Sequence, residues 1–409
     1  MKKQLSPRSI KRLLTLILAA ATLAGCSGGG NPAGTGKASQ SGSAEPEVSG
    51  STGAVQYEKT VLSHTDFDNV AIRGRSLHTE KGYRLEWPYS GFTLRGYFDG
   101  SISIQVADAQ GYADNASLTV TVDGNAEQKT LLKGAKSLVI ADVEKGYHEI
   151  TVRKGAEITA FRFTLTGLSF TGCLLEPAEP ELRIEFIGDS ITNGVGATTE
   201  DGTLRYPHGV NCLSAYSGMT AGRLGAEANI IALSGWGISK GSSSPTEIIP
   251  PIYGKYSPFD ESGAEWDFSS FRPDVIVLAL GTNDGGADPE KFRTESVAFL
   301  NQLREKNPGV PIIWIYGMMG STLSGEVKQA IADSGLDGIK YVKMPANCAG
   351  GDRHPTEKAQ EEYADKLIKE INRIIKQQKQ GRPKNVQDHF HGCGKHHIRK
   401  KRNRRHHVL

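Results

Sequence analysis

Two patterns of hydrophobic positions follow one another along the chain. Between about Val55 and Gly172, apolar or aromatic residues occupy every second position in a series of short segments, which is the period of strands with one buried face. Asp-Gly or Lys-Gly dipeptides, typical of hairpin turns, separate several of these segments. The segments are GFTLRGYF, SISIQVAD, SLTVTVDG, SLVIADV, YHEITVRK and FRFTLTGLSF. The pattern predicts an all-β sandwich domain over residues 55–173.

The pattern changes after LLEPAEPE, a segment with two prolines at 174–181. The segments LRIEFIG, NIIALSG, DVIVLALG and PIIWIYG are nearly continuous in apolar residues, as expected for strands buried on both faces. Stretches that can form helices separate or follow them, at 216–226, 289–307 and 356–376. This alternation predicts an α/β domain over residues 174–376, in which helices cover both faces of a parallel sheet.

The first 25 residues are predicted to be a secretion signal and not part of the fold. Five Lys or Arg side chains precede an apolar run over residues 13–23, which is too short for a durable membrane span. The run closes on LAGC and therefore resembles the lipobox of bacterial lipoproteins, which implies cleavage before Cys26 and diacylation of its thiol. Ordinary soluble secretion is the alternative. Either way, we expect the mature protein outside the cytoplasm, and the lipid would anchor it to the membrane.

Polar segments flank the two predicted domains. Residues 26–54 are rich in Gly, Ser, Ala and Pro and predict a flexible linker. The segment 377–409 is basic and His-rich without apolar periodicity. Three interpretations of this segment remain open. It could be a solvated disordered tail, or it could bind anionic groups of the cell wall or of lipids. It could also bind a metal ion through His389, His391, Cys393, His396 and His397.

Charge narrows the class of partner. Residues 26–380 hold 34 Lys or Arg side chains against 44 Asp or Glu, a net charge of −10, although the whole chain carries +3. An acidic body argues against nucleic-acid binding and is compatible with a neutral substrate such as a sugar polymer. The sequence does not indicate an oligomeric state.

Candidate chemistry lies where the predicted parallel strands end. Ser190, in IEFIGDSIT, follows the first of these strands, and ligands of such sheets bind beyond the carboxyl ends of the strands. Gly235 in LSGWG and Asn283 in LALGTND follow the second and third strands, and His354 in GGDRHPTE precedes the last helix. Each residue could instead be a turn, cap or surface residue. Their coincidence at one edge predicts an active site with Ser190 as nucleophile. Asp189 is predicted to bond the backbone of the turn.

These four blocks resemble the SGNH or GDSL-type hydrolases over residues 180–376. Together with TTEDGT, WDF and the preceding sandwich, they are similar to carbohydrate esterase family 2. The resemblance implies a three-layer flavodoxin-like hydrolase domain after a jelly-roll domain. It also implies an acetyl esterase of the acetyl xylan esterase type, which acts on acetylated polysaccharide.

The resemblance assigns roles residue by residue. Ser190 would attack the acetyl carbonyl, His354 would act as its base, and the N–H groups of Ser190 and Gly235 with the Asn283 amide would form the oxyanion hole. The superfamily's orienting Asp falls on Gly351 here. The side chain of Asp352 is the predicted substitute, and a backbone carbonyl is the alternative. Trp236, after the oxyanion glycine, is a candidate substrate wall or a core residue.

No metal or organic cofactor is implied, because the Ser, Asp and His cluster lacks a third convincing metal ligand. Two rival functions remain open. The same scaffold could act on other acyl groups, as a lysophospholipase, a thioesterase or a peptidoglycan O-acetylesterase. Alternatively, the chain could be a non-catalytic polysaccharide-binding lipoprotein.

Overall fold

The structure is a computed structural model that describes residues 55–111, 116–198, 206–260 and 262–381. The predicted signal, the predicted lipidation site Cys26 and the predicted linker lie outside the described residues, as does the tail from residue 382 onward. Across the described ranges, no helix combines the length and the apolar character that a membrane span requires.

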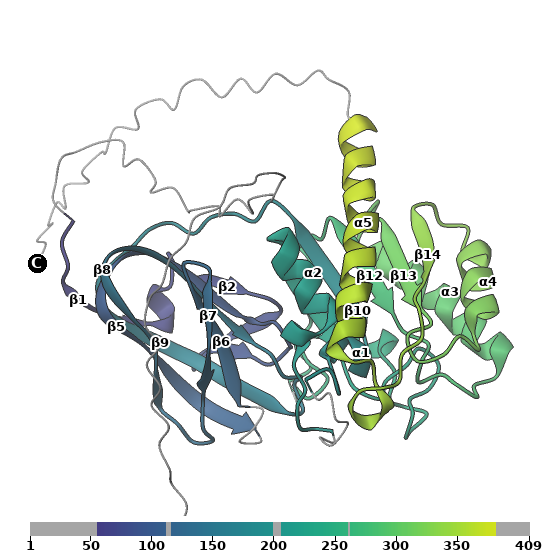
Figure 1. The fold of residues 1–409 in the computed structure, drawn as a ribbon, viewed down its shortest axis with the longest axis horizontal. Coiled ribbons are helices and arrows are strands. Elements are labelled where there is room, and N and C mark those ends of the chain that lie inside the picture. The colour runs from purple at the N-terminus through teal and green to yellow at the C-terminus, as the bar shows by residue number, and fades with distance from the viewer. Residues whose placement is uncertain (1–54, 112–115, 199–205, 261, 382–409) are drawn as a thin grey trace, which may run out of the picture. The chain divides into compact units, whose positions relative to one another are not determined.

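The N-terminal part is an antiparallel β structure (Figure 1). Its hydrogen-bonded order is β3-β4-β9-β5-β8-β6-β7, with β1 paired to β9 and β2 to β5. The strands are β1 (Lys59–Ser63), β2 (Ala71–Arg73), β3 (Ser76–Thr79), β4 (Gly82–Leu85), β5 (Gly91–Gly111), β6 (Ser117–Val122), β7 (Asn125–Thr130), β8 (Ser137–Lys154) and β9 (Phe161–Leu174).

Three of these strands are longer than the sequence pattern indicated. The Asp-Gly pair at 99–100 was predicted as a hairpin turn, but it lies inside β5, where the register with β8 shifts between Phe98 and Gly100. The Lys-Gly pair at 145–146 likewise lies inside β8. An Asp-Gly pair suits a bulge as well as a turn, because both need a residue with positive φ. The pair at 123–124, between β6 and β7, does make the predicted hairpin.

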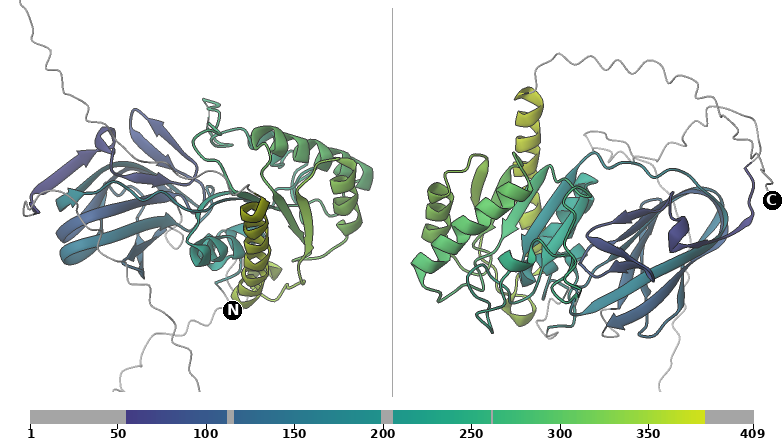
Figure 2. Two further views of the ribbon diagram at one scale, coloured as in Figure 1. Left: turned by 90° about the horizontal axis from the view of Figure 1, so that it is seen from above. Right: turned by 180° about the vertical axis from the view of Figure 1, so that it is seen from behind.

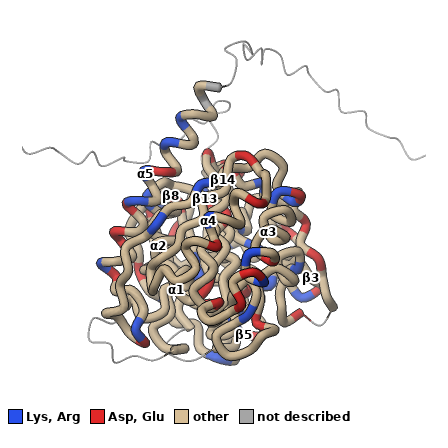
Figure 3. The backbone as a smooth tube through the Cα atoms, turned by 90° about the vertical axis from the view of Figure 1, so that its right-hand side faces the viewer, with Lys and Arg blue, Asp and Glu red and all other residues tan. Residues whose placement is uncertain are grey.

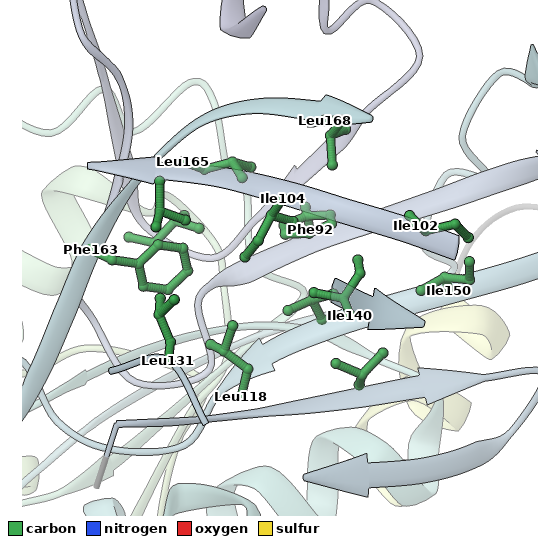
Figure 4. Close-up of a cluster of buried hydrophobic side chains, with 14 of the residues drawn as sticks. Phe92, Ile102, Ile104, Leu118, Leu131, Ile140, Ile150, Phe163, Leu165 and Leu168 are labelled. Atoms are coloured by element: carbon green, nitrogen blue, oxygen red, sulfur yellow. The ribbon is translucent and has the colours of Figure 1, made fainter. Parts of the chain in front are cut away.

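The alternating apolar residues of these strands form one core. Side chains from several strands, among them Phe92, Ile104, Leu118, Ile140 and Phe163, point into a shared interior (Figure 4). Each of these five is at most 2% exposed. The period-2 pattern therefore identified the buried face correctly, although it divided the long strands.

The C-terminal part contains a five-stranded sheet in the order β11-β10-β12-β13-β14, in which every neighbouring pair is parallel. The strands are β10 (Arg183–Gly188), β11 (Glu227–Ala232), β12 (Val275–Ala279), β13 (Ile312–Tyr316) and β14 (Ile339–Lys343). The first four match the predicted continuous apolar runs. The sequence pattern missed β14, because this edge strand is only partly buried and reads IKYVK.

Helices cover both faces of this sheet (Figure 2). Alternate residues of β10 and β12 join the core with α2 and α5, and the intervening residues join the core with α3 and α4. The helices are α1 (Ser190–Asn193), α2 (Tyr216–Leu224), α3 (Pro289–Lys306), α4 (Ser324–Asp333) and α5 (Glu357–Gly381), with short 3-10 turns η1 (His64–Asp66), η2 (Cys212–Ser214), η3 (Pro250–Ile252) and η4 (Gly351–Arg353). The last helix continues past Lys376, where the sequence pattern placed its end.

Charged residues of both signs are interspersed around α3, α4 and β14 on the face shown in Figure 3.

Candidate active site

A one-turn helix presents Ser190 at the carboxyl end of β10. Asp189 caps this helix, because its Oδ1 accepts a hydrogen bond from the N–H of Ile191 at 3.0 Å. The turn packs tightly on the strand, since a Cβ on Gly188 would lie 1.9 Å from Oγ1 of Thr192. The predicted structural role of Asp189 is therefore confirmed, and Ser190 is the first residue of α1.

His354 reaches Ser190 from the loop between β14 and α5. Its Nε2 lies 2.8 Å from Oγ of Ser190, and its Nδ1 lies 3.0 Å from the main-chain oxygen of Asp352. A carbonyl oxygen can only accept, so Nδ1 carries the proton of the neutral ring. Nε2 is consequently the acceptor for the Ser190 hydroxyl. The sequence prediction that these two residues meet agrees with this geometry.

The prediction that the carboxylate of Asp352 orients His354 disagrees with this geometry. The ring nitrogen bonds the Asp352 carbonyl, whereas Oδ2 of the same residue accepts from the N–H of Tyr206 at 2.6 Å. Asp352 and Arg353 both have positive φ, 49° and 60°, in the turn before the histidine. This left-handed pair directs the carbonyl toward the ring and leaves the side chain facing residue 206. The alternative of a backbone carbonyl is what the structure contains.

Close backbone packing holds the histidine loop against the segment after α1. The N–H of Gly351 donates to the carbonyl of Gly196 at 3.2 Å. Gly196 has a φ of +71°, and a Cβ there would lie 2.2 Å from the Gly351 oxygen. A side chain at position 196 would therefore push the histidine loop away from Ser190.

Burial sets the protonation state of the base. His354 is half-buried, and desolvation lowers its pKa below the ordinary histidine value, while the hydrogen bond and the charge of Asp352 act in the opposite direction. The imidazole is therefore neutral at pH 7 and can accept the proton of Ser190.

The predicted oxyanion residues lie on loops at the same edge. Gly188, at the end of β10, is in register with Ala232 of β11 and with Ala279 of β12. Gly235 and Asn283 follow these two strand ends within a few residues. Parallel strands present their carboxyl ends on one side, so the three loops converge beside Ser190.

Hydrogen bonds of Asn283 connect these loops. Its Nδ2 lies 2.9 Å from the main-chain oxygen of Trp236 and 3.2 Å from Oδ2 of Asp189. The structure thus brings Asn283 to the Ser190 turn, with both amide hydrogens directed at protein acceptors. Gly235 has a φ of +85°, and no described residue accepts a hydrogen bond from its N–H. Trp236 is half-buried and packs against the core shared by α3 and α4.

Sequence reasoning missed two carboxylates that hold the loop after β11. Asp284 is fully buried and accepts hydrogen bonds from the N–H groups of Ile238, Ser239 and Lys240. Its position beside Asn283 in GTND was the available signal. The second is Glu157, which contributes to this site from the antiparallel part. It lies in no motif, so no local signal marked it.

No cluster of three or more His, Cys, Asp or Glu side chains that could hold a metal ion occurs in the part of the chain that the structure describes. The described groups at the edge are a serine–histidine pair and nearby N–H donors, which suit acyl transfer.

Comparisons with known proteins agree with this chemistry. A model of the GDSL-like lipase/acylhydrolase family matches residues 186–404. The chain is 30% identical over 332 residues to the cellulase/esterase CelE of Acetivibrio thermocellus, covering 75% of this chain but only 40% of that protein. It is 23% identical over 328 residues to an acetylxylan esterase/glucomannan deacetylase of Cellvibrio japonicus, covering 75% of this chain and 89% of that protein.

A solved structure extends the likeness to the antiparallel part. The family two carbohydrate esterase from Clostridium thermocellum, in complex with cellohexaose, superposes with a TM-score of 0.68 at 27% identity and covers 75% of this chain and 99% of its own. The family model alone matches more than half of the chain. This chain therefore belongs to the GDSL-like lipase/acylhydrolase family.

Proposed function

We propose that this protein is a serine esterase that removes O-acetyl groups from polysaccharide, with acetylated xylan or glucomannan as substrates. The observation that carries the proposal is the 2.8 Å contact between Oγ of Ser190 and Nε2 of His354 at the carboxyl edge of the parallel sheet. The names of the relatives, an acetylxylan esterase/glucomannan deacetylase and a cellulase/esterase, support the ester and the polymer.

The reaction proceeds in two steps. Ser190 Oγ attacks the acetyl carbonyl while His354 Nε2 takes its proton, and the histidine then returns that proton to the departing sugar oxygen. An acetyl-serine remains. Water, deprotonated by the same histidine, attacks this ester, and acetate leaves as Ser190 recovers its proton. The Asp352 carbonyl accepts a hydrogen bond from Nδ1 throughout and stabilises the imidazolium that forms in each step.

Each step places negative charge on the carbonyl oxygen. The N–H groups of Ser190 and Gly235 stabilise it, and the Asn283 amide joins them by releasing its longer bond, the 3.2 Å bond to Asp189. Because Ser190 is the first residue of α1, its N–H has no partner within that helix. Loss of one such donor typically lowers the rate by about 10² to 10³. Trp236, next to Gly235, lines the position of the sugar.

We extend the proposal to the fold class of each part of the chain and to the location of the protein in the cell. The strand order, with β10 between β11 and β12, supports a flavodoxin-like class for the α/β part, and we assign the antiparallel part to the jelly-roll class.

Lipid on Cys26 anchors the enzyme outside the cytoplasm. Membrane fractionation of a Cys26→Ala variant tests this anchor: the variant should move to the soluble fraction, and retention in the membrane would contradict it.

Acetate release tests the function. The purified protein is incubated with acetylated xylan, acetylated glucomannan and a lysophospholipid, and Ser190→Ala serves as the matched control. Acetate from either polymer, absent in the variant, is the expected result. Fatty acid from the lysophospholipid without acetate would assign the protein to lipid substrates. Neither product, together with binding of the polymers, would assign it to the non-catalytic class.

A further inference from the structure

A single carboxylate of the antiparallel part lies against the candidate active site. Glu157 is in the loop between β8 and β9, and its side chain is 0% exposed. A buried carboxylate is unfavourable unless hydrogen-bond donors surround it. The identity of those donors indicates what the residue does.

Two segments of the α/β part supply donors to one of its oxygens. Oε2 of Glu157 accepts from the N–H of Ser234 at 3.0 Å, from the Ser234 hydroxyl at 2.6 Å, and from Nδ2 of Asn193 at 2.5 Å. The other oxygen, Oε1, accepts from the hydroxyls of Thr159 and Tyr206. Both carboxylate oxygens of Glu157 thus accept hydrogen bonds.

The two segments bonded to Oε2 carry the N–H groups assigned above to the oxyanion hole. Ser234 directly precedes Gly235, and Asn193 is the last residue of the helix that begins with Ser190. The Oδ1 atom of Asn193 is buried and has no hydrogen-bond partner among the described residues. Among the described residues, the bond to Glu157 is therefore the side-chain bond that fixes this amide. One carboxylate connects both N–H groups of the oxyanion hole.

A buried glutamate inside the parallel sheet shows a different arrangement. Glu185 lies inside β10, pairs with Arg75 and accepts from the Tyr253 hydroxyl. Neither Arg75 nor Tyr253 belongs to α1 or to the turn that contains Gly235. Burial of a carboxylate alone thus does not produce the contacts of Glu157.

We propose that Glu157 is a positioning residue for the oxyanion hole, so that the antiparallel part of the chain supplies a residue the esterase needs. The proposal rests on the proposed function of Ser190. Because Glu157 acts through the main chain of Ser234 and through α1, its removal should misplace the N–H donors. A displacement of this kind lowers kcat more than it changes KM, since the donors act on charge that develops only in the transition state.

Three variants test the proposal with p-nitrophenyl acetate as substrate. Glu157→Ala is expected to lower kcat roughly 10- to 100-fold, with KM within about threefold of wild type. Glu157→Gln should stay within about fivefold, because its carbonyl can accept from Ser234 and Asn193 while its NH₂ donates to the hydroxyls of Thr159 and Tyr206. Thr159→Val removes a donor to Oε1 and a contact with the Tyr206 hydroxyl but no partner of Oε2, and it should stay within about twofold.

Thermal unfolding accompanies each assay, so that kcat refers to folded enzyme. If Glu157→Ala does not fold, Glu157→Asp carries the test: it keeps the charge, retracts the carboxylate by one methylene group, and should lower kcat about tenfold. A folded Glu157→Ala variant with kcat within twofold of wild type would overturn the proposal. If that variant does not fold, the same result for folded Glu157→Asp would overturn it.

A second readout separates this proposal from the proposed function. Wild type is assayed first, with Ser190→Ala as the inactive control. If wild type hydrolyses no ester, the proposed function fails, and the rate at which a serine-reactive phosphonate labels Ser190 replaces kcat. That reaction also develops charge on an oxygen in the oxyanion hole. The same order of rates among the variants is expected, and equal labelling by wild type and Glu157→Ala would refute the positioning role.

Discussion

At the scale of single residues, the site depends on a main-chain atom where a side chain was expected. Sequence reasoning assigned the contact with His354 to the carboxylate of Asp352, whereas the main-chain carbonyl of that residue makes it. The left-handed backbone at Asp352 and Arg353 turns the carbonyl toward Nδ1. A carbonyl does not titrate and is not removed by a side-chain substitution, so we expect the orientation of the base to survive substitutions at position 352 that tolerate its positive φ.

Asp352→Asn should therefore be mild. Asparagine can still accept from the N–H of Tyr206 and keeps the main-chain bond to His354, so we expect kcat to fall less than about tenfold, whereas loss of an orienting carboxylate in the Ser-His-Asp template costs about 10⁴. Steady-state kinetics on an acetyl ester measure the change. A loss near 10⁴ would show that the carboxylate orients the base during catalysis.

The pH dependence of the reaction follows from the same histidine. Burial lowers the pKa of His354, and only the neutral ring accepts the Ser190 proton. His354 should therefore become protonated, and the activity should be lost, at a lower pH than for an enzyme with an exposed catalytic histidine. We expect the acid limb of kcat/KM to have its midpoint below about 6.5. In Asp352→Asn the limb should move lower still, because the Asp352 charge raises this pKa. A midpoint at or above 6.5 in wild type would be the contrary result.

At the scale of elements, local sequence signals predicted helix and strand identity better than strand ends. The Asp-Gly pairs at 99–100 and 123–124 are the same dipeptide, but one is inside β5 and the other forms the turn between β6 and β7. The pairing of the strands decides whether such a dipeptide forms a bulge or a turn, since β5 pairs with β8 on both sides of its bulge. Information of this kind is absent from a local window of sequence.

The N-terminus of α3 allows a test of how much a helix cap contributes to stability. Asp288 caps the helix, with its Oδ1 accepting from the N–H of Lys291 at 2.8 Å, and Pro289 occupies the first turn. Asp288→Ala should lower the free energy of unfolding by about 1 kcal/mol, whereas Asp288→Asn, which keeps an acceptor, should lower it by only a few tenths. Urea denaturation measures both. Equal losses in the two variants would show that the cap bond contributes nothing.

At the scale of the whole molecule, Arg75 joins the antiparallel part to the parallel sheet. Its guanidinium is 0% exposed, donates to the carbonyls of Tyr253 and Lys255 at 2.8 Å, and lies 3.5 Å from Glu185 of β10. It also lies 4.8 Å from the centre of the Trp266 ring. Contacts of this kind, together with Glu157, couple the two parts of the fold.

Arg75→Ala should be strongly destabilising, because it leaves Glu185 buried without its cation. We expect a loss of about 3–5 kcal/mol in the free energy of unfolding. Arg223→Ala, which breaks exposed ion pairs with Glu361 and Asp365, should cost at most about 1 kcal/mol. Urea unfolding of both variants measures the contrast. Comparable losses would mean that the buried pair does not hold the two parts together.

The sequence by itself determined which kind of strand each part of the chain contains and the order of the site blocks. Period-2 and continuous apolar patterns distinguish half-buried from fully buried strands, and Ser190, Gly235, Asn283 and His354 lie at element ends that a parallel sheet must bring to one edge. The tertiary structure alone decided which atom of Asp352 faces His354, because that depends on two backbone dihedral angles. It also decided that Glu157 meets Ser234, 77 positions away, since packing between distant segments leaves no local pattern.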